Sequence, residues 1–375
     1  MKPLELDTDL FDRLSQRRGK DLISIVIPTH QKGRDVAQDP IRLKNELSNA
    51  EGQLEDLGWK PRERSDRLAN ARALLEDKEF WEHQSAGLGL FVDDESKITP
   101  VSIPVDVDPT SHVAQVFHLR HLVPGMGLAR VPVLVLTKNA VRLMYGSKFV
   151  IEQVEVDLPE SFDDVNWFVD REKERQQHPD RVGTARNRHG HEPSSRENED
   201  RSRFLRAVAD ALPRDLVSTP LVVLGDDDLV ERFGNVVDFE TVSPRNSGVS
   251  RVEDASAILE LAVPAMEMIE TARESEALKL AMDRLGVGAA STSIVDALPD
   301  AVSGRVSDLV MTRGIEPIWG RLDATEMTVA VNDAPRPGDV DLLDRLVVES
   351  RKTGASITTV AESIEGDSFI ATHRY

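Results

Sequence analysis

The chain has 375 residues, no cysteine and a formal net charge of −20 at pH 7. The absence of cysteine excludes disulfides, thiolate metal sites and cysteine nucleophiles, and it is compatible with a reducing cytoplasm. The acidity argues against a protein that coats nucleic acid indiscriminately, because Lys and Arg dominate such binding by neutralising phosphates. No apolar run reaches the length that crosses a bilayer, and the polar N-terminus is unlike a signal peptide, so we expect a cytoplasmic protein without membrane contact.

The first part of the chain has the pattern of an α/β domain over residues 19–128. After a helical leader over 1–18, the apolar, β-branched run 22–27 predicts a buried strand. Asp39 and the proline after it are typical of a helix N-cap and first turn, and leucines at helical spacing continue that helix to Gly58. Further elements expected before residue 129 are a helix near 67–75 and strands over 87–92, 98–107 and 113–119.

A second α/β domain is expected over 129–245. Two apolar runs separated by a short polar turn predict a hairpin, and Ser194 with Glu197 predicts a capping box for a helix with an apolar stripe. The expected elements are strands over 131–136, 141–144 and 151–156, the helix with Phe204, Val208 and Leu212 on one face, and a buried strand over 221–224.

The remaining residues, 246–375, are expected to form a third α/β domain. Ser250 and Glu253 predict the cap of a helix that reaches Ala262, and Pro264 starts or kinks the next helix, which continues to Gly286. The later elements expected are a short helix over 294–298, strands over 309–312 and 327–331, a helix over 339–352 and strands over 357–360 and 369–372.

A long arginine-rich segment, residues 171–206, follows the strands of the middle domain and is called the basic segment below. It contains ten Lys and Arg and seven Asp and Glu, which gives a net charge of 10 − 7 = +3 in an acidic protein. From residue 176 to residue 193 almost nothing apolar is available to bury, so we expect a solvated loop there. Such a loop is either functional or a tolerated surface insertion, and both interpretations stay open at this point.

Two other residue patterns could carry chemistry. LISIVIPT at 22–29 resembles the opening strand of family-two glycosyltransferases, and Asp226-Asp227-Asp228 could hold the divalent ion on a nucleotide-sugar diphosphate. These features fall in different expected domains, which favours a simple polar strand end for the acidic triplet. The histidines lack the spacing of a zinc site and are interpreted as structural or surface residues, so we expect no metal site and no cofactor; they include His83, His112, His118, His121, His189 and His191.

Three stretches carry a resemblance to a known family. LISIVIPTH with the long helix after it, and GLGLFV with the succeeding IPVDVDPTSHV, form the first. VPVLVLTKNAVRLMYGSKFVIEQVEVDLP, the basic segment, FLRAVADAL and LVVLGDDDL form the second, and GASITTVAES with the terminal FIATHRY forms the third. Together they resemble the N-terminal, middle and C-terminal domains of the bacterial branch of the archaeo-eukaryotic peptide-chain release factor and Pelota superfamily. The resemblance implies three consecutive mixed α/β domains.

The same resemblance bears on catalysis. In release factors of this superfamily the corresponding middle-domain loop carries Gly-Gly-Gln, which promotes ester hydrolysis of peptidyl-tRNA. Here residues 188–193 are Arg-His-Gly-His-Glu-Pro, and PIRLKNEL occupies the region of the stop-codon-reading NIKS motif. The resemblance therefore implies neither peptidyl-tRNA hydrolysis nor codon-specific termination, and no catalytic residue is carried over. Pelota-like members also lack Gly-Gly-Gln and act on stalled or idle ribosomes without hydrolysis.

We accordingly predict a non-catalytic, ribosome-associated factor of translation rescue, recycling or hibernation, which acts as a monomer on rRNA or tRNA; a translational GTPase as a further partner stays open. Three alternatives remain: a hydrolase of an RNA or tRNA ester with a loop histidine as base, the metal-dependent glycosyltransferase, and an acidic scaffold for another translation factor. The predicted RNA-binding residues are Arg181, Arg186, Arg188, His189, His191, Arg196, Arg201 and Arg203 in the basic segment, and His30, Lys32, Arg34, Arg42 and Lys44 in an N-terminal patch that would face the decoding region.

Overall fold

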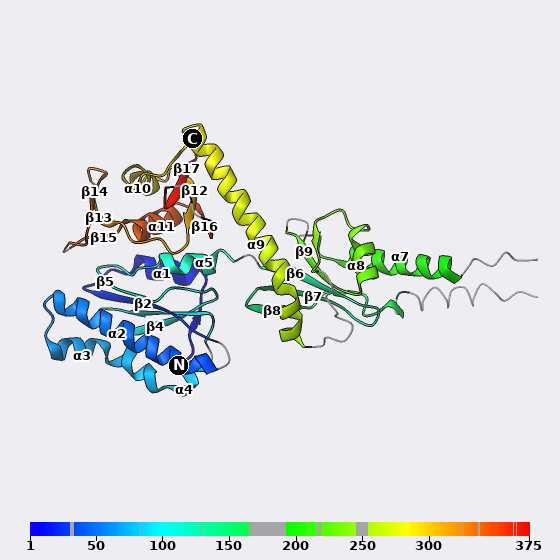
Figure 1. Cartoon of the computed structure of the whole chain (residues 1–375), viewed down its shortest axis with the longest axis horizontal. Coiled ribbons are helices and arrows are strands. Elements are labelled where there is room, and N and C mark those ends of the chain that lie inside the picture. The colour runs from blue at the N-terminus through cyan, green and yellow to red at the C-terminus, as the bar shows by residue number, and fades with distance from the viewer. Residues whose placement is uncertain are drawn as a thin grey trace, which may run out of the picture. The chain divides into compact units, whose positions relative to one another are not determined.

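The three-dimensional structure is a computed structural model (Figure 1). It describes residues 1–30, 34–82, 84–128, 130–163, 165, 193–214, 216, 219–244, 254–323, 325–336, 338–362, 364 and 366–375. The chain forms two compact units, and each is described by itself below. Unit 1 consists of residues 1–128 and 272–375, and unit 2 consists of residues 129–271. Both units are mixed α/β, as the sequence predicts, whereas the three domain boundaries stay a prediction.

The N-terminal part of unit 1 is built on a five-stranded sheet with the strand order β1-β4-β3-β2-β5. Strand β1 runs parallel to β4, and the other neighbours are antiparallel. Figure 1 shows α2, α3 and α4 on one side of this sheet and α1 and α5 on the other. The elements are β1 Leu4–Glu5, α1 Thr8–Gln16, β2 Leu22–Pro28, α2 Asp39–Asp56, α3 Pro61–Ala73, α4 Lys78–Trp81, β3 Gly87–Val92, β4 Ile98–Ile103, β5 Thr110–Ala114 and α5 Val123–Met126, with 3-10 turns η1 Arg34–Gln38, η2 Leu74–Glu76 and η3 Arg120–Leu122.

Strand β2 is buried along almost its whole length because both faces of the sheet are covered. Its alternate residues Ile23 and Ile25 pack against Leu43 and Leu47 of α2 and Leu68 of α3. The continuous apolar run at 22–27 therefore has the role that the sequence predicts, a buried strand inside the sheet.

The role of Asp39 differs from the helix N-cap that the sequence predicts. The residue before it, Gln38, occupies the N-cap of α2, and Asp39 is the first helical residue with a fully buried side chain. Its carboxylate accepts hydrogen bonds from the backbone N–H of His30 at 2.9 Å and from Arg42 Nη1 at 2.8 Å. The carboxylate therefore joins the segment after β2 to the start of α2, because the backbone N–H of His30 and the guanidinium of Arg42 both donate to it.

Strand β5 is also shorter than the apolar run predicts. It ends at Ala114, and residues 115–119 lie outside the sheet. The backbone N–H groups of His118 and Leu119 donate to the side chains of Ser24 and Asp344, respectively. Because these side chains satisfy the backbone, the apolar run does not need a neighbouring strand.

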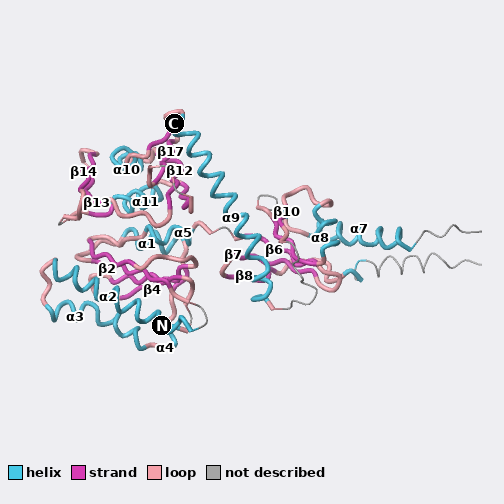
Figure 2. Tube along the Cα trace, viewed as in Figure 1, coloured by secondary structure: helices cyan, strands magenta, loops and turns pink. Residues whose placement is uncertain are grey.

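The C-terminal part of unit 1 contains a four-stranded sheet, β11-β17-β12-β16, and a three-stranded sheet, β14-β13-β15. Strands β12 and β16 are parallel, and the other pairs are antiparallel. Figure 2 shows these strands in magenta beside α10 and α11. The elements are β11 Ala290–Ser291, α10 Ile294–Val302, β12 Val306–Thr312, β13 Trp319–Asp323, β14 Thr328–Asn332, β15 Val340–Asp341, α11 Leu342–Lys352, β16 Ser356–Val360 and β17 Phe369–His373; the sequence analysis missed β11, β13 and β15.

Unit 2 is a five-stranded sheet with the order β10-β9-β6-β7-β8. Strands β6 and β7 form the predicted antiparallel hairpin, and β9 joins β6 in parallel. The elements are β6 Val131–Leu136, β7 Val141–Ser147, β8 Val150–Val154, α7 Pro193–Ala211, β9 Leu221–Gly225, α8 Asp227–Gly234, β10 Thr241–Val242 and the first part of α9 Ala255–Gly286. Residues 193–206 of the basic segment are therefore helical, and α7 begins at Pro193, before the N-cap predicted at Ser194.

Both faces of the unit 2 sheet carry a core. Val133 and Val135 of β6 pack with Ile258 of α9 on one face. Leu134, between them in the sequence, packs with Phe204 of α7 on the other face. This alternation explains why β6 is an uninterrupted apolar run, since each side chain meets a helix whichever way it points.

Helix α9 continues through Pro264, so the helix predicted to reach Ala262 and the one predicted after it are a single helix that does not start at the proline. Proline lacks the N–H that would donate to the carbonyl four residues earlier, that of Glu260. Pro264 and Glu260 are both exposed, so water can satisfy this carbonyl, while Ala262 and Ala265 beside them stay buried. None of the described helices combines the length and apolar composition required to cross a bilayer.

Phe204 anchors α7 to the unit 2 sheet, because its side chain is fully buried and its ring packs edge-to-face on Phe162 at 5.5 Å. We expect Phe204→Ala to lower the free energy of unfolding of unit 2 by about 3–5 kcal/mol. Val150→Ala, at a side chain that is 54% exposed, should change it by less than about 0.5 kcal/mol. Hydrogen exchange of β6 and β9 peptides in increasing urea measures both variants, and equal losses would contradict the anchoring role of Phe204.

Candidate functional site

The structure describes only part of the predicted RNA-binding set. For Arg196 and Arg34 it gives backbone positions, on α7 and on η1. Arg42, Lys44, His30, Arg201 and Arg203 are described with their side chains. The predicted residues outside the described ranges are Arg181, Arg186, Arg188, His189, His191 and Lys32.

Two of the predicted arginines on α7, Arg201 and Arg203, have acidic partners. Arg201 Nη1 lies 2.8 Å from Asp228 Oδ2, and Arg203 Nη1 lies 3.1 Å from Asp200 Oδ1. The side chain of Arg201 is only 19% exposed. The first pair links α7 to α8, and the second lies within α7. Both offset part of the positive charge, and Arg201 also serves the packing of α7 on α8.

The acidic triplet 226–228 starts helix α8. Asp226 occupies the N-cap, and Asp227 and Asp228 lie in the first turn, where negative charge is favourable at a helix N-terminus. Arg232 also binds Asp228, at 2.8 Å. A hydrogen bond from Arg232, followed by the charges of Arg232 and Arg201, lowers the pKa of Asp228. The triplet thus has a structural role as a helix start paired with arginines.

In the N-terminal patch, His30 and Arg42 both contact the buried Asp39. His30 Nδ1 lies 2.9 Å and Arg42 Nη1 lies 2.8 Å from the same carboxylate oxygen. Lys44, on the next turn of α2, is exposed. Among the described members of the patch, Lys44 is therefore the residue that presents its charge to solvent most directly.

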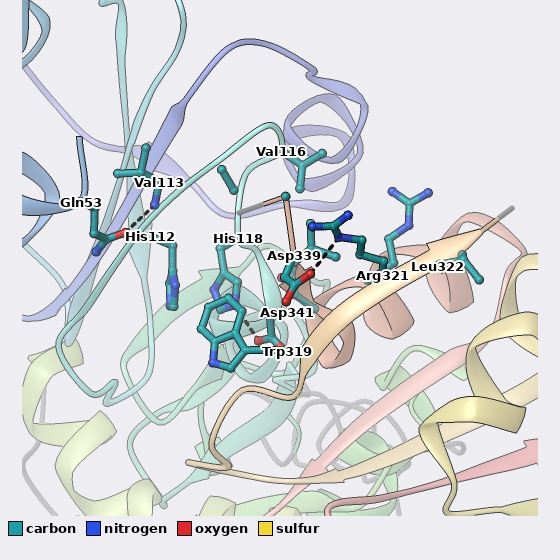
Figure 3. A pocket seen from close by; sticks show the side chains of 15 residues that line it. Gln53, His112, Val113, Val116, His118, Trp319, Arg321, Leu322, Asp339 and Asp341 are labelled. Carbon is teal, nitrogen blue, oxygen red and sulfur yellow. Dashed lines mark hydrogen bonds and ion pairs between the residues drawn. The ribbon is translucent and has the colours of Figure 1, made fainter. Parts of the chain in front are cut away.

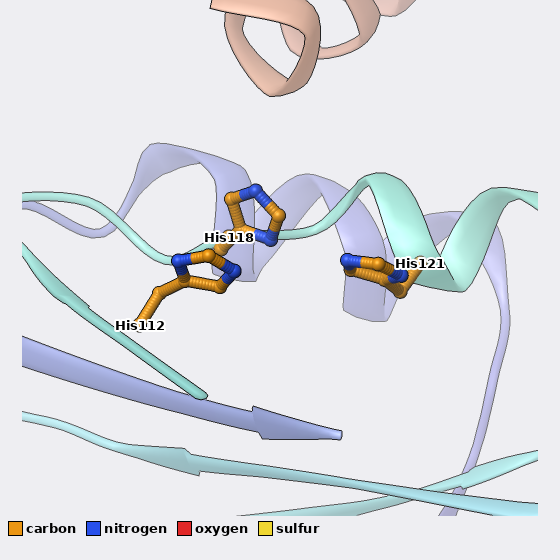
Figure 4. A group of neighbouring side chains, drawn as sticks. All are labelled: His112, His118 and His121. Atoms are coloured by element: carbon orange, nitrogen blue, oxygen red, sulfur yellow. The ribbon is translucent and has the colours of Figure 1, made fainter. Parts of the chain in front are cut away.

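A cluster of three histidines in unit 1 is the feature that the sequence analysis missed. His112 lies on β5, His118 lies just before η3, and His121 lies within η3. One side-chain nitrogen of each lies within 4.8 Å of those of the other two (Figure 4). The rings of His112 and His118 are 4.0 Å apart, centroid to centroid, and those of His118 and His121 are 5.2 Å apart. The sequence analysis treated these histidines as unrelated structural or surface residues.

Two buried carboxylates at the start of α11 hold this cluster in position. Asp341 is the N-cap of α11 and accepts from the backbone N–H of Leu343, while its other oxygen lies 2.8 Å from His118 Nε2 and 2.9 Å from Arg120 Nε. Asp344 accepts hydrogen bonds from the backbone N–H groups of Leu119 at 2.6 Å and Arg120 at 2.7 Å. The first turn of α11 therefore fixes the segment 118–120.

Burial keeps the three imidazoles neutral. It lowers the pKa of His112 to about 3, with a further contribution from His118. Burial, followed by the charge of Arg120, lowers the pKa of His118 well below its ordinary value. Burial is also the main cause that lowers the pKa of His121, with His118 and Arg120 after it. A neutral imidazole has one nitrogen lone pair that can accept a hydrogen bond or bind a metal.

A cavity of about 330 Å³ opens beside His112 and His118 (Figure 3). Its wall combines Trp319 and Arg321 of β13 with residues of α2, β5 and α11. Gln53 of α2 forms one side of it and ties the strand edge, donating to Ser111 O at 2.8 Å and accepting from the Val113 N–H at 2.9 Å. The cavity is large enough for several waters or a small ligand.

These features define a mixed α/β protein of two units, with an arginine-rich helix start in one and a buried histidine cluster in the other. Residues 132–305 match the family described as bacterial archaeo-eukaryotic release factor family 3. Over these residues the match supports the predicted resemblance to bacterial members of the archaeo-eukaryotic release factors. None of the curated proteins matches the chain.

Several solved structures are similar to the chain at low identity. They include an archaeal translation termination factor, aRF1 (15% identity, 99% of each chain covered, TM-score 0.25). A ribosome-bound archaeal Pelota, in a structure with ABCE1, shares 9% identity over 98% of this chain and 93% of that chain, with a TM-score of 0.40. Dom34 of S. cerevisiae shares 10% identity over 77% and 79%, with a TM-score of 0.32.

Burial, reinforced by the nearby negative charge of Asp341, raises the pKa of Asp344 from 3.8 to about 7. Between these values the folded protein keeps a proton that the unfolded chain has released, so the free energy of unfolding falls as pH rises from about 4 to 7. This fall is at most on the order of 4 kcal/mol. We expect Asp344→Asn to remove this pH dependence, because an amide does not titrate. The fold should be kept, since the amide oxygen can still accept from both backbone N–H groups. Chemical unfolding at a series of pH values measures it, and Asp333→Asn, at an exposed carboxylate, is the control.

Proposed function

We propose that this protein is a non-catalytic, ribosome-associated translation factor of rescue, recycling or hibernation that binds rRNA or tRNA through its basic segment. The observation that carries the proposal is the match of residues 132–305 to a bacterial release factor family, because the matched range includes the whole segment 171–206. The remaining observations concern how that segment is held and what its residues can do.

The basic segment is attached to a packed scaffold at both ends. The last strand before it, β8, pairs with β7, and α7, which contains its C-terminal part, packs on the sheet through Phe204 and Val208. Functional loops are commonly mounted on rigid elements in this way, because the scaffold then fixes where the loop begins and ends. This arrangement favours the hypothesis that the loop contacts a partner, and it disfavours the hypothesis that the loop is a tolerated insertion without function.

The residues in the segment support docking over hydrolysis. The resemblance puts Gly-Gly-Gln of the release factors where this chain has Arg188-His-Gly-His-Glu-Pro193. Arginine presents five N–H donors in a planar fork that can grip phosphate oxygens in pairs. RNA offers closely spaced phosphates. A segment of charge +3 in an otherwise acidic protein therefore favours an RNA contact that is confined to this segment.

The ion pairs of α7 bear on which of the predicted arginines we assign to an RNA contact. Arg201 and Arg203 each have an acidic partner, so their replacement would disturb α7 as well as any RNA contact. We therefore assign the main RNA contact to Arg181, Arg186, Arg188 and Arg196, which precede that part of the helix. Arg206, exposed on α7, and Lys44, exposed on α2, are secondary candidates.

Co-sedimentation with ribosomes tests this assignment. Replacing Arg181, Arg186, Arg188 and Arg196 by Ala should weaken binding and reduce the slope of log affinity against log salt by roughly 2.8–3.6, because each of the four lost phosphate contacts contributes about 0.7–0.9. The matched control removes four exposed charges elsewhere and should bind as the unchanged protein does; it replaces Lys78, Lys97, Lys279 and Arg336 by Ala.

Three outcomes would count against the proposal, each at a different point. Absence of co-sedimentation from growing, starved and stalled cells would exclude ribosome association. An unchanged salt slope in the four-arginine variant would exclude the basic segment as the contact. Release of peptide from purified peptidyl-tRNA would show catalysis and would favour the hydrolase alternative.

A further inference from the structure

The histidine cluster of unit 1 has the properties of a metal site, and it lies outside the basic segment on which the proposed function rests. We propose that His112, His118 and His121 bind one divalent transition-metal ion of the zinc class. The inference rests on the convergence of the three ring nitrogens, on an unpartnered nitrogen among them, and on the groups that orient the rings.

The three rings share one space. Figure 4 shows His118 and His121 turning a nitrogen towards each other, with His112 beside them. The ligand nitrogens lie within 4.8 Å of one another. In a tetrahedral zinc site with Zn–N bonds of about 2.0–2.1 Å, two nitrogens are about 3.4 Å apart. Each pair therefore has to close by at most about 1.4 Å, which small rotations of the side chains can supply.

His121 provides the second observation. Its Nε2 is buried and has no hydrogen-bond partner among the described residues. A buried polar atom without a partner costs free energy, so such an atom in a native protein calls for an explanation. A metal ion between the rings would take the lone pair of this nitrogen and supply that explanation.

The other two rings are oriented by hydrogen-bonding groups outside the cluster. His118 Nε2 lies 2.8 Å from the carboxylate of Asp341, which leaves Nδ1 for the shared space. A carboxylate often accepts the hydrogen bond from the other nitrogen of a metal-binding histidine, since it fixes the tautomer and raises the basicity of the ligand. His112 Nε2 lies 3.0 Å from Thr110 Oγ1, a hydroxyl that a metal ion would displace or accompany.

The set of donors points to the kind of metal. Three imidazoles without thiolate suit zinc, copper, nickel or iron, and they do not suit magnesium or calcium, which prefer oxygen ligands. Three protein ligands leave a fourth position for water or a small ligand, as catalytic zinc sites do. The 330 Å³ cavity that His112 and His118 line provides space for that ligand.

The experiment uses the full-length chain, stripped with a chelator and then titrated with Zn²⁺ or Co²⁺. We expect one equivalent of tightly bound metal, a visible absorption spectrum of tetrahedral Co²⁺, and X-ray absorption that reports nitrogen and oxygen ligands. His121→Asn should weaken metal binding by more than the roughly 10–100-fold that follows the loss of a group which only hydrogen-bonds to a ligand. It is the preferred variant because His121 Nε2 has no described partner to lose.

Two controls separate this site from other histidines. The triple replacement of His178, His189 and His191 by Asn removes the histidines of the basic segment and should leave binding unchanged, as should His373→Asn at a histidine paired with Asp300. If His121→Asn fails to fold, the Co²⁺ spectra of the unchanged protein and of the triple variant still test the proposal, because both should show the same tetrahedral complex. Absence of a stoichiometric Co²⁺ complex, or its loss in the triple variant, would overturn the proposal. Neither result bears on ribosome binding.

Discussion

The buried carboxylates of Asp341 and Asp344 are the constraint on which unit 1 depends. They lie on the first turn of α11, yet their partners are His118, Leu119 and Arg120, more than two hundred residues earlier in the chain. Burying two carboxylates this close to each other is costly unless donors surround them. Here backbone N–H groups and an imidazole provide those donors, and the Arg120 guanidinium forms an ion pair with Asp341, so the cost is offset only when both parts of unit 1 come together.

This constraint also explains the position of the histidine cluster. Because Asp344 holds the backbone of residues 119–120 and Asp341 holds His118, the segment after β5 leaves the sheet and turns back over it. That turn brings His118 and His121 to His112, which stays on the strand. The site is therefore built on two packed elements and a fixed turn, which is the rigidity that a ligand site requires.

In unit 2 the packed sheet holds α7 in place, and the residues of the basic segment carry the positive charge. The sheet has a core on both faces, and α7 is anchored by Phe204 while its N-terminal turns carry arginines. The pairing of Arg201 with Asp228 shows that part of this charge serves packing. A count of arginines along the segment therefore overstates the charge that is available to a partner.

The sequence by itself determined the local elements whose physical signal is contiguous. The buried strand at 22–27, the hairpin of β6 and β7 and the apolar face of α7 follow from runs and periodicities, and the order of these elements carried the family resemblance. Short or irregular strands such as β13 and β15 have no contiguous apolar run that would predict them. Pro264 suggested the start of a new helix, because the sequence did not show that the position is exposed within α9. Only the tertiary structure decided the environment of Asp39, the end of β5 and the meeting of His112, His118 and His121. The physical reason is distance along the chain: a buried carboxylate selects its partners in space, and residues 118 and 341 have no local pattern that relates them.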